Sequence, residues 1–379
     1  MAVGKVNDVA GASIGKVKDV AAASIGKISD IGASLGGETH ADLWVLCGND
    51  GNVGYSTDAA GENVANWTIA AEGGGTDMFA VAFANTGSYG DGLWAFARNS
   101  NGAEVEYTTD NPPAASRSQV NLDGSRGARS IHYDQGGQKF MVGAKSLSAA
   151  KSIMTSSFGA DSSDTAAGVW SASASASDYS DATSNYGIFQ HDNIGSNGAG
   201  VWMVGVIDDL IVSTDNGVNW SLVSGSNFQA AGKDVKTVDY ANGVWLIAGE
   251  SGFLKRTADN GTTWTDQDIA FGSDNVVSVA FGGAGDSTAN VWIGVGGNGK
   301  ISRSTDNGIT WALVDGGHNV TLNAVASNGS GSWVAVGNSG KLGYSTDDGS
   351  TWTFATASSG TGVNLRGVAI NRMLPHTPG

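Results

Sequence analysis

The sequence predicts an all-β fold, a seven-bladed β-propeller with four-stranded blades, and three repeated features of the chain support this prediction. A turn motif rich in Ser, Thr, Asp, Asn and Gly recurs and ends in Trp. An aromatic residue opens an apolar run once in each unit, and a shorter apolar run precedes it. Units of roughly 40 to 50 residues that repeat with strand and turn chemistry are typical of propeller blades.

The composition agrees with this fold class. The 379 residues include 58 Gly and 12 Trp but only 4 Pro. Abundant glycine turns favour many short strands over long helices. An all-β chain of this length often forms a single domain.

The turn motif reads Ser-Thr-Asp-Asn-Gly-Val-Asn-Trp at residues 213–220 and is nearly repeated at residues 304–311. Asp and Asn side chains bond nearby backbone N–H groups, Gly supplies a positive φ, and Trp supplies a large apolar anchor. We interpret the motif as a structural fastener between the third and fourth strands of a blade. Its aspartates and tryptophans are Asp58, Asp110, Asp215, Asp259, Asp306, Asp347, Trp67, Trp220, Trp264, Trp311 and Trp352.

Two further landmarks fix the number of blades and the way the ring closes. The aromatic residues that open the second strands are Trp44, Trp94, Phe140, Trp202, Trp245, Trp292 and Trp333. The expected inner strands contain residues 81–83, 131–133, 188–190, 238–240, 279–281, 325–327 and 368–370. Because the first unit lacks an inner strand and the last copy lacks a unit, we expect residues 365–373 to complete the blade that begins at Leu43. This closure removes the exposed sheet edge.

The chain is expected to divide into an N-terminal repeat segment at residues 1–40 and the propeller at residues 41–379. The segment repeats an eleven-residue pattern, which suits a right-handed bundle of helices. Its several glycines destabilise a helix, so the alternative is an extended structure that a partner orders. A narrow apolar stripe needs a partner, so we expect anchoring or oligomerisation. The stripe contains Val6, Val9, Ile14, Val17, Val20, Ile25, Ile28 and Ile31.

The turn motif, of the form Ser-x-Asp-x-Gly-x-Thr-Trp, resembles the Asp-box or BNR repeat of sialidase-like propellers over residues 42–373. This resemblance implies the fold and no single activity, because such propellers include sialidases, xyloglucan hydrolases, sortilin-type receptors and photosystem assembly factors. The N-terminal repeat is similar to leader segments of structural proteins from marine bacteriophages. This second resemblance implies a virion protein.

One position per blade is predicted to lie near one mouth of a central channel. These residues stand two places before the Val or Ile of each inner strand. Two arginines and a lysine there suit the binding of an anion or a glycan, and the alternative is that they only line a solvated channel. The positions are Phe79, Arg129, Tyr186, Lys236, Val277, Asn323 and Arg366.

The sequence predicts no catalytic residues, metal site or cofactor. A sialidase needs three convergent arginines and a tyrosine-glutamate nucleophile pair, and no such set is apparent among the eight arginines. A glycosidase needs two carboxyl groups across a cleft; Asp77, Asp234 and Asp239 are candidates, but most acidic residues fall in turns. The five histidines lack metal-ligand spacing.

The net charge of −16 disfavours a nucleic-acid partner, which needs basic residues to neutralise phosphates. We also expect no signal peptide and no membrane insertion. The expected function is therefore a non-enzymatic bacteriophage virion protein, such as a tail fibre, spike or capsid decoration. Residues 1–40 would bind other virion proteins or their own copies, and the propeller would bind host-surface glycans. The alternatives are a glycan-active hydrolase and a cellular propeller scaffold or assembly factor.

Overall fold

A computed structural model describes most of the propeller. The described residues are 42–57, 67–71, 75–84, 92–99, 103–109, 113, 117–123, 127–134, 136–144, 153–156, 170–172, 193–206, 209–223, 233–282, 290–315, 319–356 and 363–371. The repeat segment and its apolar stripe lie outside these residues, so the division at residue 40 stays a prediction. No helix within the described ranges is long and apolar enough to cross a membrane.

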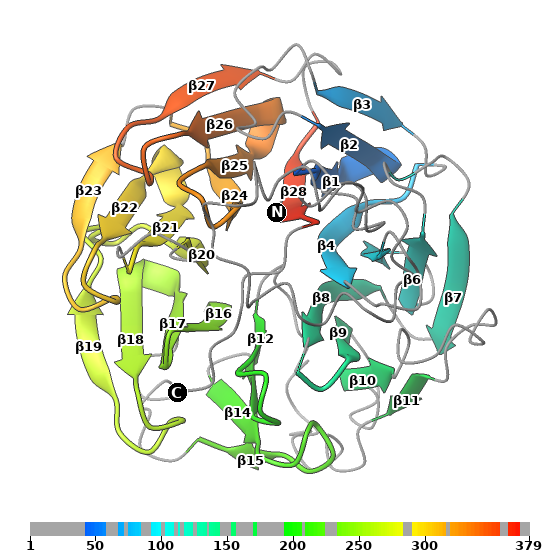
Figure 1. Cartoon of the computed structure of the whole chain (residues 1–379), viewed down its shortest axis with the longest axis horizontal. Coiled ribbons are helices and arrows are strands. Elements are labelled where there is room, and N and C mark those ends of the chain that lie inside the picture. The colour runs from blue at the N-terminus through cyan, green and yellow to red at the C-terminus, as the bar shows by residue number, and fades with distance from the viewer. Residues whose placement is uncertain are drawn as a thin grey trace, which may run out of the picture. The chain divides into compact units, whose positions relative to one another are not determined.

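The described strands form seven antiparallel sheets of four strands each, arranged as a ring (Figure 1), which confirms the predicted fold class. We number the blades along the chain. Blade 1 contains β28 (Leu365–Ile370), β1 (Trp44–Gly48), β2 (Asn52–Ser56) and β3 (Thr68–Ala71), listed from the centre outward. Blade 2 contains β4 (Met78–Ala84), β5 (Leu93–Asn99), β6 (Ala103–Thr108) and β7 (Ser118–Asp123). Blade 3 contains β8 (Ala128–Asp134), β9 (Lys139–Ala144), β10 (Ile153–Ser156) and β11 (Trp170–Ala172).

The remaining blades follow the same order. Blade 4 contains β12 (Ile194–Ser196), β13 (Trp202–Val206), β14 (Asp209–Ser213) and β15 (Ser221–Leu222). Blade 5 contains β16 (Val235–Ala241), β17 (Val244–Gly249), β18 (Phe253–Thr257) and β19 (Thr265–Asp268). Blade 6 contains β20 (Val276–Phe281), β21 (Trp292–Gly296), β22 (Ile301–Ser304) and β23 (Ala312–Asp315). Blade 7 contains β24 (Leu322–Ser327), β25 (Trp333–Gly337), β26 (Lys341–Ser345) and β27 (Thr353–Thr356).

The ring closes through the two ends of the propeller, as the sequence predicts. Strand β28 pairs antiparallel with β1, so that Ile370 lies opposite Trp44 and Gly367 lies opposite Cys47. The backbone N–H of Asn371 also bonds the carbonyl oxygen of Leu43 at 3.0 Å. The C-terminal strand therefore occupies the edge that β1 would otherwise expose.

The expected inner strand of blade 4 at residues 188–190 is wrong, because β12 begins at Ile194 and pairs with β13. The turn between these strands explains the difference. The Oδ1 atom of Asn197 accepts hydrogen bonds from the backbone N–H groups of Ala199 (2.9 Å) and Val201 (3.0 Å). Because this turn is tight, the residues just before Asn197 are the ones that pair with β13, and the apolar run at residues 188–190 does not set the register.

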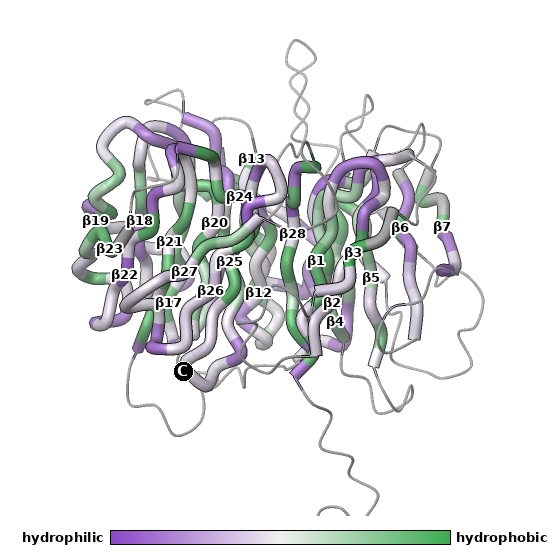
Figure 2. Tube along the Cα trace, turned by 90° about the horizontal axis from the view of Figure 1, so that it is seen from above, coloured by the Kyte–Doolittle hydropathy of each residue, from purple (hydrophilic) through white to green (hydrophobic). Residues whose placement is uncertain are grey.

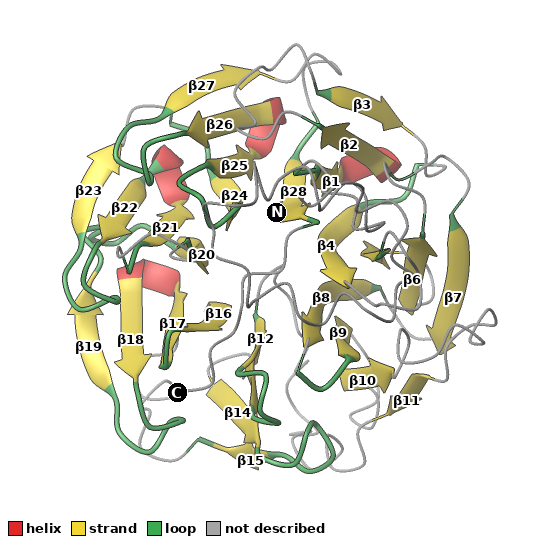
Figure 3. Cartoon of the chain, viewed as in Figure 1, coloured by secondary structure: helices red, strands yellow, loops and turns green. Residues whose placement is uncertain are grey.

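The hairpins between second and third strands share one turn type in four blades. These hairpins are three-residue 3₁₀ turns, drawn as short red segments in Figure 3. The middle residue has a positive φ in each, which these small or polar residues tolerate. The turns are η4 (Asn49–Gly51), η9 (Glu250–Gly252), η10 (Gly297–Gly299) and η11 (Asn338–Gly340).

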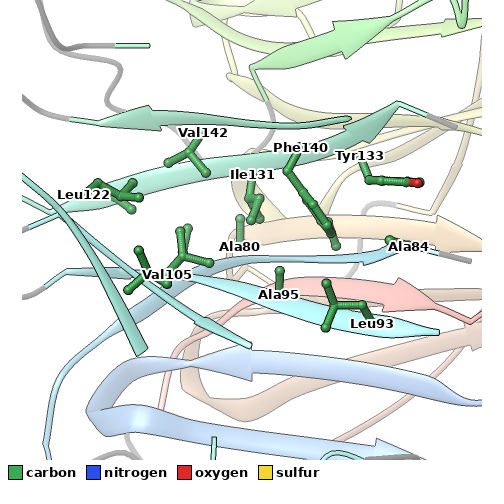
Figure 4. Close-up of a cluster of buried hydrophobic side chains, with 14 of the residues drawn as sticks. Ala80, Ala84, Leu93, Ala95, Val105, Leu122, Ile131, Tyr133, Phe140 and Val142 are labelled. Carbon is green, nitrogen blue, oxygen red and sulfur yellow. The ribbon is translucent and has the colours of Figure 1, made fainter. Parts of the chain in front are cut away.

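The core lies between neighbouring blades, and apolar residues follow the strands while polar residues gather at turns (Figure 2). Between blades 2 and 3, Val105 and Leu122 pack with Ile131 and Val142 (Figure 4). Tryptophans of the second strands are fully buried in six blades: Trp44, Trp94, Trp202, Trp245, Trp292 and Trp333. Burial of such large side chains stabilises the contacts between adjacent sheets.

Candidate functional site

The residues predicted for the channel mouth share an unexpected feature, because six of them sit at a β-bulge of their inner strand. In blade 5, for example, Val235 pairs with Gly249 and Thr237 pairs with Ala248, so that Lys236 is left between them. A bulge redirects a side chain and is common next to binding sites. We call these six residues the bulge ring; they are Arg366, Phe79, Arg129, Lys236, Val277 and Asn323.

The bulge ring lies on one face of the propeller. Every inner strand pairs antiparallel with its second strand, so the start of the inner strand lies beside the hairpin that ends the second strand. In blade 1, Arg366 reaches this hairpin directly, and its Nε atom donates to the Oδ1 atom of Asn49. The bulge ring and the 3₁₀ turns therefore form one surface.

Lys236 and Asn323 of the bulge ring make polar contacts within the propeller, as Arg366 does with Asn49. Lys236 forms a salt bridge of 3.1 Å with Glu250 in the hairpin of its own blade. The Nδ2 atom of Asn323 donates to the Oδ1 atom of Asn338 (2.9 Å) and to the carbonyl oxygen of Leu365 (2.7 Å). Asn323 thus ties blade 7 to blade 1.

Three other members form a cluster across three neighbouring blades. The guanidinium carbon of Arg129 in blade 3 lies over the Phe79 ring of blade 2, 4.0 Å from its centroid. That of Arg366 in blade 1 lies over the same ring at 4.7 Å. Cation–π contacts of this kind hold a guanidinium in place. We call Arg129, Phe79 and Arg366 the arginine–phenylalanine cluster.

The charged groups of the cluster act on one another. Burial lowers the pKa of Arg129, the positive charge of Arg366 lowers it further, and Asp77 acts in the opposite direction. The carboxylate of Asp77 lies 3.9 Å from Arg366. Within the described part of the chain, Arg129 has no carboxylate within salt-bridge distance, and its buried Nε atom has no hydrogen-bond partner. The cluster therefore combines two guanidinium groups with one nearby carboxylate.

Tyr186, the seventh residue of the predicted mouth, lies outside the described residues. The corrected inner strand of blade 4 also moves the equivalent position, two places before Ile194, to Asp192. Asp192 is outside the described residues as well. Blade 4 therefore contributes no described residue to the bulge ring.

The candidate carboxylates differ in their surroundings. Asp77 belongs to the surroundings of the cluster, and its Oδ1 atom accepts the backbone N–H of Asp50 at 3.1 Å. The carboxylate of Asp239 accepts the backbone N–H of Tyr240 at 2.8 Å. The sequence analysis named Asp77 only as a candidate carboxylate for hydrolysis. Its position two residues before Phe79 already indicates that it lies on the face of the bulge ring.

The turn motif lies on the opposite face, because it joins the third and fourth strands. The Oδ1 atom of Asp215 accepts the Ser213 hydroxyl (2.8 Å) and the backbone N–H of Asn219 (2.8 Å). The same hydroxyl oxygen accepts the backbone N–H of Gly217 at 2.9 Å. Equivalent aspartate bonds occur at Asp259, Asp306 and Asp347. Asp58 and Asp110 are outside the described residues.

Other reactive groups in the described ranges do not gather into a site. No group of three or more His, Cys, Asp and Glu side chains there is placed to hold a metal ion. Cys47 is buried, and this burial raises the pKa of its thiol to about 12. A thiol with so high a pKa is a poor nucleophile.

The fold and the bulge ring define a seven-bladed β-propeller with a partly cationic face. Solved structures with a similar fold include YCF48 from Cyanidioschyzon merolae, with a TM-score of 0.52, 13% identity, and coverage of 78% of this chain and 94% of that chain. YCF48 bound to a D1 peptide has a TM-score of 0.51 and 14% identity, with coverage of 77% of this chain and 92% of that chain. The computationally designed Ika8 protein has a TM-score of 0.50 and 11% identity, with coverage of 85% of this chain and 92% of that chain.

These likenesses show the fold alone, because the identities are low. No protein-family profile matches the sequence, and no curated protein matches it at a significant level. The function is therefore argued from the residues of this chain.

Proposed function

We propose that this protein is a non-enzymatic bacteriophage virion protein, such as a tail fibre, a spike or a capsid decoration. Residues 1–40 attach it to other virion proteins or to further copies of itself. The propeller is displayed to bind glycans of the host surface through the bulge ring. This location and this role rest on the sequence resemblances.

The arginine–phenylalanine cluster is the observation that carries the binding role. It places two guanidinium groups from different blades over one ring. Exposed-face arginines that are held by an aromatic ring are common in recognition surfaces. Elsewhere in the ring, Lys236 pairs with Glu250 and Asn323 bonds Asn338. The cluster is the part of the ring where two cations from different blades lie together.

Two experiments test this function. Cryo-EM of the intact particle should place residues 1–40 against another virion protein, and finding them solvent-exposed and disordered in the assembled particle would contradict the anchor. Incubation with a broad glycan panel should reveal binding without release of sugar. Turnover that Arg129→Ala abolishes would instead establish the hydrolase alternative.

A cellular assembly factor is the second candidate, because one of the similar propellers is YCF48, solved with a D1 peptide. On this alternative the bulge ring binds a protein partner in the cell that makes the chain. Affinity capture from that cell, compared between wild type and Arg366→Gln, tests it. Recovery of one defined partner only with the wild type would support the assembly factor over the virion protein.

A further inference from the structure

We propose that the side chains of Lys139 and Asn216 join in an isopeptide bond that links blade 3 covalently to blade 4, and that Asp134 transfers the protons in this reaction. The three residues lie at one seam between the two blades, where Lys139 already contacts Asn216. The proposal is argued from this seam and is independent of the proposed function.

The acid and the amine are specific to blade 3. Asp134 and Lys139 are cross-strand partners at the hairpin between its inner and second strands. In the six other blades the position of Lys139 holds an aliphatic residue or serine, and the position of Asp134 is also uncharged. The residues that correspond to Asp134 are Ala84, Asn197, Ala241, Gly282, Asn328 and Asn371. The repeat itself therefore does not require this pair.

The lysine reaches the next blade. Its Nζ atom donates to the backbone carbonyl oxygen of Asn216 at 2.9 Å. Elsewhere in the ring an arginine makes the same kind of contact, from Nε of Arg256 to the carbonyl oxygen of Asn307 at 2.9 Å. A guanidinium stays protonated, whereas a lysine amine can lose its proton and act as a nucleophile. Because only Cα and Cβ separate the backbone carbonyl carbon of Asn216 from its Cγ, rotation of the flexible lysine side chain brings Nζ from one carbonyl to the other.

The carboxylate of Asp134 faces the same carboxamide. Asp134 is fully buried, and its Oδ1 atom accepts the backbone N–H of Gly136 at 3.0 Å. Its Oδ2 atom is buried and has no hydrogen-bond partner among the described residues. A Cβ atom at Gly137 would lie 2.7 Å from this oxygen and 3.1 Å from Oδ1 of Asn216. The Oδ2 atom and the carboxamide therefore border one small space, and a proton from Lys139 would satisfy the buried oxygen.

The carboxamide of Asn216 is also activated for attack. The indole N–H of Trp202 donates to its Oδ1 atom at 3.0 Å. A donor at this oxygen stabilises the negative charge that develops when an amine adds to Cγ. Trp202 belongs to a buried apolar cluster with Met141 and Ile153 of blade 3. Apolar surroundings favour the neutral, nucleophilic form of an amine.

The reaction balances without a co-reactant. Asp134 accepts a proton from the Lys139 ammonium, and the nitrogen lone pair forms the bond from Nζ to Cγ of Asn216. The bond from Cγ to Nδ2 then breaks as Asp134 returns the proton to Nδ2. Of the three ammonium protons, one stays on the new amide and two leave with Nδ2 as an ammonium ion. No group is oxidised or reduced, and the carboxylate is regenerated.

Mass spectrometry of the full chain tests the inference. The intact mass should be lower by one ammonia than the sequence requires. A tryptic digest should contain one branched peptide in which Lys139 is joined to Asn216, and trypsin should not cleave after the modified lysine. Cell-free synthesis followed by mass measurement over time gives the rate of linkage.

Two variants at the seam separate the amine from the acid. Lys139→Arg keeps a cation for the carbonyl oxygen of Asn216 but should keep the full mass, because a guanidinium does not form the bond. Asp134→Asn keeps the Oδ1 acceptor for Gly136 but carries no proton. The rate of linkage should therefore fall about 100-fold or more, a usual contribution of general acid–base catalysis. Stability comparisons that involve Asn216 are cleanest in the Lys139→Arg background, which lacks the bond.

Arg256→Lys is the matched control for the acid. It places an amine beside Asn307, in the same kind of contact that Lys139 makes with Asn216. The residue of that blade that corresponds to Asp134 is Ala241. We expect no bond between the new lysine and Asn307.

The outcomes decide between the bond and its alternatives. A wild-type chain that keeps its full mass after prolonged incubation overturns the proposal. Ammonia loss that persists in Lys139→Arg also overturns it, because the Asn–Gly step at 216–217 can lose ammonia by cyclising on its own backbone. Equal rates of linkage in the wild type and Asp134→Asn overturn the role of the acid. If a variant fails to fold, the wild-type peptide map still decides. None of these results depends on glycan binding, so the proposed function is tested separately.

Discussion

The indole nitrogen of Trp202 donates a hydrogen bond of 3.0 Å to the side-chain oxygen of Asn216, and this bond joins the second strand of blade 4 to its turn motif. The same bond occurs in blades 5 and 6, from Trp245 to Asn260 (2.9 Å) and from Trp292 to Asn307 (3.0 Å). Each asparagine has a positive φ, which Asn adopts more readily than most residues. The asparagine therefore both forms the turn and accepts the hydrogen bond of the buried indole N–H group.

Blade 7 departs from this arrangement and gives the first prediction. It carries Asp348 at the asparagine position, and within the described residues neither the buried Oδ1 of Asp348 nor the buried Nε1 of Trp333 has a hydrogen-bond partner. Asp348→Asn supplies a neutral acceptor for the indole and removes a charge beside Asp347. We expect the free energy of unfolding in urea to rise by about 1 kcal/mol.

The reverse change in blade 4 is the matched control. Asn216→Asp should lower the free energy of unfolding by a similar amount, because it places a second negative charge beside Asp215 and half-buries that charge at the Trp202 indole. A lower free energy of unfolding for Asp348→Asn would show that a neutral acceptor at position 348 does not stabilise blade 7.

The second prediction concerns Asp215, whose carboxylate holds the turn motif together. Its oxygens accept from the Ser213 hydroxyl, the backbone N–H of Asn219 and the side chain of Asn219. Asp215→Ala should reduce the free energy of unfolding by about 1 to 2 kcal/mol, as for the loss of a capping side chain. Val218→Ala, in the same turn but 51% exposed, should stay within about 0.5 kcal/mol. Loss of ligand binding with unchanged stability would contradict the structural role.

The third prediction is a loss of stability in acid. Hydrogen bonds from the Thr257 side chain, and then from Thr263, lower the pKa of Asp259 to about 2. At Asp306 partial burial is the largest single influence and raises the pKa, but the hydrogen bonds from Thr310 and Ser304 outweigh it and the pKa is lowered. Hydrogen bonds likewise lower the pKa of Asp215 and Asp347.

The direction of the pH effect follows from these pKa values. Because the folded pKa of Asp259 lies below the ordinary value of 3.8, its contribution to stability is complete above that value and is lost as the pH falls toward about 2. The urea midpoint should therefore decline over this interval. Asp259→Asn should show a shallower decline, and an identical decline in the variant would exclude Asp259 as one of its causes.

The fold could be predicted from the sequence because its determinants are local and repeated. The turn motif at Asp215 and the buried Trp202 recur in nearly every unit, so counting them gives the number of blades. The pairing of β28 with β1 follows from the same count. The inner strand of blade 4 was missed because an apolar run at residues 188–190 resembles a strand, whereas the turn at Asn197 decides the register.

The candidate site could be predicted only in part. Periodicity places Arg129 and Lys236 at equivalent positions, and both are cations. Their surroundings differ, because Lys236 meets Glu250 and Arg129 meets Phe79. These contacts depend on side-chain direction at the bulges and on neighbours in other blades, which the repeat pattern does not encode.

The last prediction concerns a buried charge network in blade 2. Glu106 is 2% exposed, and its carboxylate accepts from Arg98 (2.6 Å), Arg117 (2.9 Å) and Gln119 (2.9 Å). The side chain of Arg117 is also only 2% exposed, and its ion pair with Glu106 is therefore a buried one. Removing one partner of a buried ion pair leaves the other charge uncompensated and costs about 3 to 5 kcal/mol. Glu106→Gln should therefore destabilise the propeller severely.

Glu104 provides the matched control for Glu106. It lies two residues away on β6, is 21% exposed, and meets Arg98 at 3.5 Å. A pair of this kind contributes about 1 kcal/mol or less, because water screens it and Arg98 keeps its shorter bond to Glu106. Urea denaturation should thus separate Glu106→Gln from Glu104→Gln by at least about 2 kcal/mol. Equal losses of unfolding free energy in the two variants would mean that the buried network relaxes or admits water when Glu106 loses its charge. Burial would then not determine how much Glu106 contributes to stability.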